Sequence, residues 1–176
     1  IAMSNDGLSH SLTGSSTWIT SKKSRDDVQS LRANYDAIVT GGNTVRDDNP
    51  RMNARVSYDV NQPRRIVITR EKNWDMKMNF FRDNNFEIVN SCQLDEFIKS
   101  FQDRDTCSLL IEAGPKLVNS FLDAGLCDQF VIYKSNRDLG QNSVPWFENK
   151  NALIKKGFKL KARSYIESDV KEVYTI

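Results

Sequence analysis

Residues 37–55 read AIVTGGNTVRDDNPRMNAR, and the other motifs of the chain are arranged around them. The apolar run at residues 37–39 fits a short buried strand. The run ends at Gly41 and Gly42, where glycine permits backbone angles closed to other residues and lets a ligand's phosphate come close. A strand that ends in glycine-rich polar chain is a usual geometry for a phosphate-bearing ligand in an α/β fold. A strand followed by a solvated turn explains the same pattern, and both interpretations stay open at this point.

Length and charge limit the classes of protein that fit. The chain has 176 residues, which suits one domain with a sizeable core. Its 25 basic and 23 acidic residues give a net charge of +2, so no electrostatic feature favours nucleic acid as a partner. No apolar run approaches the roughly 20 residues of a membrane span. The chain opens in mid-pattern at Ile1, which leaves room for an upstream segment.

Cysteine and histidine content narrows the chemistry. The cysteines Cys92, Cys107 and Cys127 are odd in number and have no C-x-x-C spacing, so we expect neither a disulfide framework nor a zinc site. This usage indicates a reducing, cytoplasmic location. His10 is the only histidine, which argues against a metal site and against a histidine-based catalytic triad. The chemistry must then use carboxylates, hydroxyls, Lys, Arg or a bound cofactor.

Strands alternate with helices along most of the chain, and two strands close it. We expect strands at residues 1–4, 37–39, 65–69, 86–89, 108–111 and 129–133, and a hairpin of residues 158–166 and 170–176. Helices are expected from a cap at Thr20 or Ser21 to about Tyr35, over residues 94–101, and from Pro115 to a stop at Gly125. Polar loop is expected at residues 8–16 and an irregular connection at residues 72–85. This order predicts a single α/β domain over residues 1–176, with a mostly parallel central sheet flanked by helices and a C-terminal antiparallel hairpin.

A second glycine-containing corner lies at residues 112–117, EAGPKL. Gly114 stands where a strand passes into a helix, and the N–H groups at a helix N-terminus bind phosphate readily. Glu112, at the tip of the strand, can accept hydrogen bonds from a sugar or a base, or move a proton. A full G-x-G-x-x-G fingerprint is absent, which disfavours an ordinary Rossmann site. A plain strand–turn–helix corner with an exposed Glu remains the alternative.

Two further side chains are candidates on local grounds. Trp18 lies beside a Ser/Thr-rich loop and could cover a flat ring, although such a Trp is more often packed in the core. Arg32 lies on the first expected helix, where a solvated charge is the alternative.

The motifs occur together in one order: Ser4-x-Asp6-Gly7, Trp18-Ile19-Thr20, Gly42-x-Thr44-x-x-x-Asp48-x-Pro50-x-Met52-x-x-Arg55 and Glu112-Ala113-Gly114-Pro115-x-Leu117. In this the chain resembles the reductase domain of the bacterial bifunctional riboflavin-biosynthesis deaminase/reductase, which has a dihydrofolate-reductase-like fold. The similarity runs from Ile1 to about Gly140 and is weaker in the closing hairpin. Members of the family commonly have Leu at the position of Met52.

The resemblance implies NADPH-dependent reduction of 5-amino-6-(5-phosphoribosylamino)uracil to its ribitylamino form. The positions it implies for the cofactor are Ala2, Trp18, Thr44, Asp48 and Arg70, with the cofactor's phosphates at Gly114, Pro115, Lys116, Leu117, Val118, Asn119 and Ser120. The positions it implies for the phosphorylated substrate are Ser16, Arg32, Met52, Arg55 and Glu112. A homodimer, and a deaminase domain upstream or on a separate chain, are implied as well.

Roles follow for a few of these residues. Glu112 is expected to orient or protonate the substrate, with Asp48 helping to hold cofactor and loop. Arg70 is a candidate for the cofactor's 2′-phosphate, and Arg55 and Arg32 are candidates for the substrate's phosphate, because a guanidinium pairs phosphate oxygens with a planar fork. A pterin or folate reductase of the same fold and a catalytically silent nucleotide-binding module remain as alternatives.

Overall fold

The computed structural model describes residues 1–12, 18–90, 93–101, 104–149 and 151–176. The chain divides into two compact units. The middle unit is one continuous segment, Val28–Leu126, and the terminal unit combines Ile1–Asp27 with Cys127–Ile176. Among the described residues, no helix is both long enough and apolar enough to cross a membrane.

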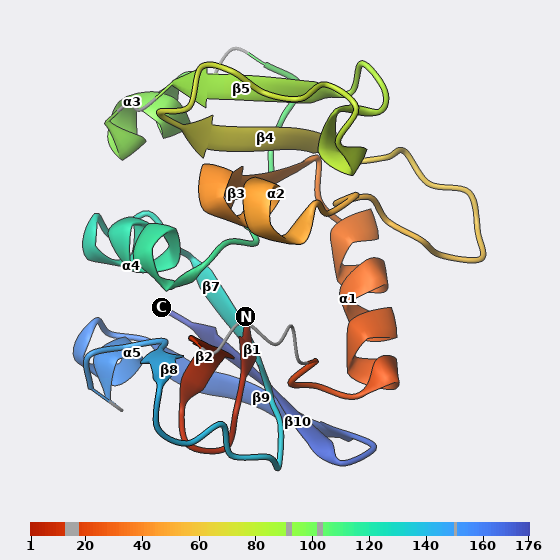
Figure 1. Cartoon of the computed structure of the whole chain (residues 1–176). Coiled ribbons are helices and arrows are strands. Elements are labelled where there is room, and N and C mark those ends of the chain that lie inside the picture. Colours follow the sequence, from red (N-terminus) through yellow and green to blue (C-terminus); the bar gives the residue numbers. More distant parts are fainter. Residues whose placement is uncertain (13–17, 91–92, 102–103, 150) are drawn as a thin grey trace. The chain divides into compact units, whose positions relative to one another are not determined.

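The middle unit is built on a sheet of four parallel strands (Figure 1). In sheet order the strands are β5 (Phe86–Asn90), β4 (Arg64–Thr69), β3 (Ala37–Gly41) and β6 (Leu109–Ile111). The helices are the end of α1 (Lys22–Ala33), α2 (Gly42–Asp48), α3 (Leu94–Lys99), α4 (Pro115–Asp123) and the 3-10 helix η1 (Asn79–Phe81). The expected parallel α/β arrangement is confirmed here.

Strand β3 is the buried centre of this sheet. Ala37, Ile38 and Val39 are fully buried, as expected for a parallel strand that has a neighbour on each side. Ile38 belongs to an apolar cluster that also contains Val45, Met52, Val67, Phe80 and Phe81. The buried strand expected at the start of residues 37–55 is therefore confirmed.

The order of strands creates a switch point beside β3. The chain passes from β3 to β4 and β5 on one side and then returns to β6 on the other side of β3. In open α/β sheets, ligands bind outside the carboxyl ends of the strands at such a point. The chain leaves β3 and β6 there through the two glycine-containing corners.

The terminal unit is mostly antiparallel. Its larger sheet has the order β1 (Ala2–Met3), β7 (Gln129–Lys134), β10 (Asp169–Thr175) and β9 (Lys159–Ile166), with only the β1–β7 pair parallel. Its smaller elements are β2 (Leu8–Ser11), β8 (Ser143–Pro145) and α5 (Ala152–Lys155). The predicted C-terminal hairpin is confirmed as β9 and β10.

The start of α1 is fixed inside the terminal unit by Asp169. The Ser21 hydroxyl accepts the N–H of Ser24 at 3.2 Å, which confirms the expected cap. Asp169 Oδ2 accepts the N–H of Ser21 at 2.7 Å and the hydroxyl of Ser24 at 2.6 Å. Asp169 is only 1% exposed, so this contact joins both ends of the chain in a buried polar cluster.

Three sequence expectations are wrong. Residues 42–48 form helix α2 instead of a turn, and α2 ends at Asn49, whose left-handed φ of 42° closes it with a hydrogen bond to the Val45 carbonyl. Leu8–Ser11 is strand β2 instead of loop, because it pairs with β8 far along the chain. The strands also fall into three sheets instead of one.

Candidate active site

The two glycine-containing corners meet at the switch point. The Glu112 N–H donates to the Val39 carbonyl at 2.9 Å, which places the end of β6 beside the end of β3. A Cβ added to Gly41 would lie 3.6 Å from Leu117 Cδ2, in ordinary contact with α4. The structure thus brings together the two motifs that the sequence separates by about 70 residues.

Arg32 and Glu112 form a bidentate ion pair in the middle unit. Arg32 Nε donates to Glu112 Oε2 at 2.8 Å, and Nη2 donates to Oε1. The remaining nitrogen, Nη1, donates to the Asn53 carbonyl at 3.2 Å. Arg32 is 8% exposed, so the interpretation as a solvated charge is wrong. Paired hydrogen bonds of this kind fix the plane and direction of the carboxylate.

Arg55 lies at the surface beside this pair. Its N–H donates to Gln29 Oε1 at 3.3 Å, and its Nη1 donates to Asn53 Oδ1 at 2.9 Å. Desolvation, followed by the charges of Arg32 and Arg51, lowers the pKa of the Arg55 guanidinium, while Glu112 acts in the opposite direction. The Arg55 guanidinium is therefore close enough to two other guanidinium groups to interact with their charges, which suits a doubly charged phosphate.

The N-terminus of α4 fits an anion such as a diphosphate. Gly114 is the N-cap in extended conformation, and it makes no side-chain capping bond. A Cβ at Gly114 would meet no heavy atom within 4 Å. Further along, Asn119 Nδ2 donates to the Pro115 carbonyl and the Ser120 hydroxyl donates to the Lys116 carbonyl, both at 2.9 Å. The space at this corner and the positive end of the helix dipole are the features that phosphate binding needs.

The corner at α2 has a different construction. Gly42 is buried, and a Cβ there would lie 2.5 Å from Thr69 Oγ1. Thr44 is half-buried within α2, and Asp48 is exposed at its last residue. Arg70 is exposed directly after β4. The absence of a side chain at Gly42 is thus explained by internal packing.

Met52 stands apart from the other expected substrate contacts. It has a left-handed φ of 46° and is 3% exposed, with its side chain in the apolar cluster. A ligand would therefore meet Met52 through its backbone. Ser16 lies outside the described residues.

Two expected cofactor contacts belong to the terminal unit. Ala2 lies in β1, and its carbonyl accepts the indole N–H of Trp146 at 2.6 Å. Trp18 is 70% exposed, with the Arg25 guanidinium 4.5 Å from its ring centre. The interpretation of Trp18 as a packed core residue is wrong, and an exposed aromatic face is what stacking on a flat ring requires.

Sequence reasoning missed several polar side chains around Arg55. Hydrogen bonds to the segment that carries Arg55 come from Gln29, Asn53 and Gln62. The positive charge of Arg51 acts on Arg55 as well. Arg51 could have been found, because it precedes Arg55 by four residues in the same motif. The two glutamines bind backbone atoms, and no local pattern marks such residues.

Comparison with known proteins assigns the chain to a family. The model described as "RibD C-terminal domain" matches residues 1–170. The chain belongs to this family. The riboflavin biosynthesis protein RibD of Aquifex aeolicus is 28% identical over 163 residues, which cover 80% of this chain and 46% of that protein. The chain therefore spans about half the length of this curated relative.

Solved structures agree with the family. Acinetobacter baumannii RibD, form 1, has a TM-score of 0.87 at 25% identity, covering 99% of this chain and 56% of that one. A Thermotoga maritima protein titled diaminohydroxyphosphoribosylaminopyrimidine deaminase/5-amino-6-(5-phosphoribosylamino)uracil reductase has a TM-score of 0.83 at 23% identity, covering 99% and 54%. Dihydrofolate reductase from Enterococcus faecalis, at a TM-score of 0.63 and 14% identity over 99% and 92%, shares the fold. The expected dihydrofolate-reductase-like fold is confirmed.

Proposed function

We propose that this RibD C-terminal domain reduces 5-amino-6-(5-phosphoribosylamino)uracil to 5-amino-6-(5-phosphoribitylamino)uracil with NADPH. The observation that carries the proposal is the Arg32–Glu112 pair beside Arg55 and Arg51 at the switch point of the parallel sheet. The family membership supports the reaction, and the reductase named in the Thermotoga protein's title supports the substrate.

The substrate's phosphate is assigned to Arg55, with Arg51 adding charge. Arg32 was the second candidate from the sequence, but three of its five N–H groups already donate to Glu112 and the Asn53 carbonyl. We therefore assign Arg32 to holding Glu112. Both Glu112 oxygens accept from Arg32, so Glu112 is suited to orienting the substrate through their remaining acceptor capacity.

The cofactor is assigned to the corner of β6 and α4. NADPH supplies the hydride when it is bound. The N–H groups at the start of α4 would hold its diphosphate, and the open space at Gly114 permits that approach. The remaining proposed cofactor contacts are Ala2, Trp18, Thr44, Asp48 and Arg70, with Arg70 proposed for the 2′-phosphate.

The assay follows NADPH absorbance with the aminouracil ribotide as substrate. A charge-assisted hydrogen bond contributes about 1.5–3 kcal/mol, so Arg55→Ala should raise KM for this substrate about ten- to a hundredfold. KM for the dephosphorylated analogue and the Kd for NADPH should barely change. Arg104→Ala, which removes another surface arginine of the middle unit, is the matched control.

Three outcomes would contradict the proposal or one of its assignments. Turnover of dihydrofolate in place of the ribotide would indicate a folate reductase. NADPH binding without any turnover, at every protein concentration and with no effect of Glu112→Gln beyond affinity, would indicate a silent nucleotide-binding module. An equal loss for both substrates in Arg55→Ala would remove Arg55 from phosphate recognition.

Four broader expectations stay predictions. They are a single reductase domain over residues 1–176, a homodimer that uses the C-terminal strands, a cytoplasmic location, and a deaminase domain upstream or on a separate chain. The Thermotoga title, which names both activities, supports the last of these.

A further inference from the structure

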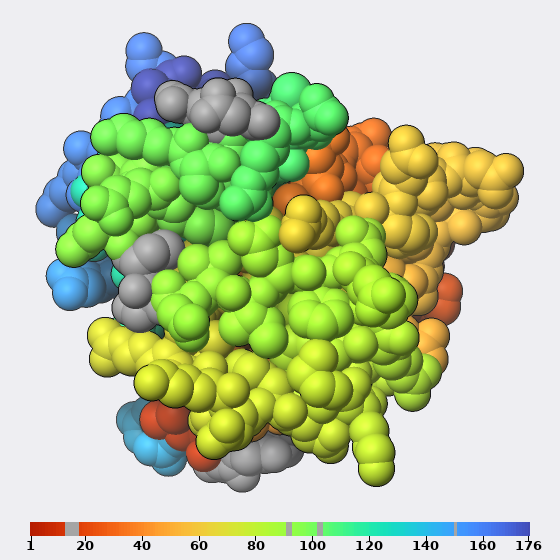
Figure 2. All heavy atoms as spheres, turned by 90° about the horizontal axis from the view of Figure 1, so that it is seen from above, coloured from red at the N-terminus to blue at the C-terminus, as the bar shows by residue number. Residues whose placement is uncertain are grey.

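The segment that carries Arg55 has no regular secondary structure. Residues 49–63, between α2 and β4, form neither helix nor strand, and this golden part of the chain stands out from the surface in Figure 2. Within it the backbone at Met52 is left-handed, which an L residue adopts only when its surroundings impose it. Some other part of the molecule must therefore determine where Arg55 lies.

Side chains from outside the segment bind its backbone at every second residue from 51 to 55. Arg65 Nη1 donates to the Arg51 carbonyl at 3.4 Å, Arg32 Nη1 donates to the Asn53 carbonyl, and Gln29 accepts the Arg55 N–H. These contacts take the place of the backbone ladder that a helix or strand would supply.

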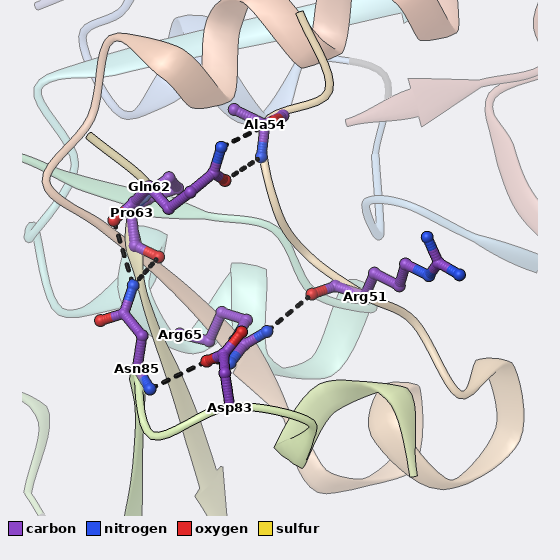
Figure 3. Close-up of polar contacts among 7 residues, drawn as sticks. All are labelled: Arg51, Ala54, Gln62, Pro63, Arg65, Asp83 and Asn85. Atoms are coloured by element: carbon purple, nitrogen blue, oxygen red, sulfur yellow. Dashed lines mark hydrogen bonds and ion pairs between the residues drawn. The ribbon is translucent and has the colours of Figure 1, made fainter. Parts of the chain in front are cut away.

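Gln62, which lies within the same segment, makes two further bonds to its backbone. Its Oε1 accepts the Ala54 N–H and its Nε2 donates to the Ala54 carbonyl, both at 2.9 Å (Figure 3). The carbonyls of Gln62 and Pro63 in turn accept from Asn85 Nδ2, at 3.1 and 3.2 Å. Gln62 is thus fixed on the side of β5 and holds both polar groups of the residue immediately before Arg55.

Packing and hydrogen bonds fix the segment together, since Met52 and Ala54 are buried. A hollow of about 210 Å³ opens beside it, lined by polar residues that include Arg51, Asn53 and Gln62. Gln62 itself is exposed, so its replacement removes little buried apolar surface. Beside the hollow, hydrogen bonds add to this packing, and Gln62 supplies a reciprocal pair of them.

We infer that Gln62 is a positioning residue for substrate phosphate recognition, acting through the Ala54 backbone on Arg55. The inference rests on the proposed function, in which Arg55 binds the phosphate. Without the two bonds to Ala54, the segment samples other positions, and Arg55 is correctly placed for a smaller fraction of the time.

The test compares Gln62→Ala with the wild type in the NADPH assay. We expect KM for the phosphorylated substrate to rise about three- to tenfold, because each of the lost bonds has a modest net value. KM for the dephosphorylated analogue, kcat and the Kd for NADPH should stay near wild type, whereas the thermal midpoint should fall, because the buried Ala54 peptide groups lose their partners. Asn61→Ala, which removes the neighbouring exposed amide, is the control and should match the wild type in all of these.

A double-mutant cycle with Arg55→Ala provides the second test. If Gln62 acts through Arg55, adding Gln62→Ala to Arg55→Ala should raise KM no further. Additive losses, or a Gln62→Ala enzyme equally impaired with both substrates, would overturn the inference. If Arg55→Ala alone fails to separate the two substrates, the proposed function of Arg55 fails instead, so the two failures are distinguishable.

Discussion

The corner from β3 to α2 and the corner from β6 to α4 both contain glycine, but the surroundings of the glycine differ. At the first, a Cβ on Gly42 would lie 2.5 Å from Thr69 Oγ1, so the neighbouring strand leaves no room for a side chain. At the second, a Cβ on Gly114 would meet no heavy atom within 4 Å. Gly42 is required by the protein's own packing, whereas Gly114 borders open space.

The difference shows that a glycine after a strand does not by itself indicate a binding site. What lies opposite the missing side chain decides between a packing role and a binding role. Substitutions at the two corners should therefore separate stability from cofactor binding.

The largest effect is expected from Gly42→Ala. Its methyl group must displace Thr69, and overpacking of this kind costs about 1–3 kcal/mol. Denaturant unfolding should show this loss of stability, while the Kd for NADPH of the folded fraction stays close to wild type. Gly41→Ala is the matched control, because its Cβ would meet only Leu117 at 3.6 Å.

A double variant shows whether Thr69 is the cause. Adding Thr69→Ala removes Oγ1, so the combined loss of stability should be smaller than the sum of the two single losses. Strict additivity would show that Gly42 is needed for another reason.

Gly114→Ala should have a smaller effect, and the effect should be on NADPH binding instead of stability. The φ of −70° at this position suits alanine, so unfolding free energy should change by less than about 1 kcal/mol, the usual cost of a poorer N-cap. The methyl group would occupy the space assigned to the cofactor's diphosphate, and the Kd for NADPH measured by fluorescence titration should rise about tenfold, equivalent to ~1.4 kcal/mol. Unchanged affinity would move the diphosphate away from this corner.

The smallest effect is expected at the N-terminal ends of β3 and β6. There Asp36, just before β3, accepts hydrogen bonds from the Ser108 hydroxyl at 2.8 Å and the Cys107 N–H at 2.9 Å. These bonds, that of the Ser108 side chain first, lower the pKa of Asp36 from its ordinary 3.8. The unfolded chain then binds this proton more tightly than the folded one, so the stability from Asp36 is present above pH 3.8 and is lost as pH falls through the lowered pKa.

Unfolding of Asp36→Asn across acid pH measures this contribution. The variant should be slightly less stable than the wild type at neutral pH, and the two stability curves should converge below about pH 4. A constant difference at every pH would mean that the charge of Asp36 contributes nothing.

The parallel strands were predictable because their signals are local. The apolar runs that became β3, β4 and β5 are short and end at polar or turn-forming residues. Strands β2 and β8 were missed because they pair with each other across most of the chain, which no local pattern reveals. Helix α2 was missed because Gly41 and Gly42 suggest a turn, whereas burial of Val45 and the closure at Asn49 stabilise a helix there.

In the candidate site, several residues were predictable from the sequence, whereas the contacts between them were not. Glu112 and Arg55 were named from motifs and Arg32 from the family resemblance, and the structure brings them together in the middle unit. Their contacts were not predictable: the commitment of Arg32 to Glu112 depends on how α1 and β6 pack. Gln62 was not predictable at all, because its partner is a peptide group.

The buried contact of Asp169 with the start of α1 has a consequence for synthesis of the chain. Ser21 and Ser24 meet Asp169 across 148 and 145 residues. A growing polypeptide leaves the ribosome N-terminus first, so all of Val28–Leu126 is available to fold before Asp169 has been made. Residues 1–27 complete their unit only after Asp169 has been made, when residues 28–126 are already able to fold.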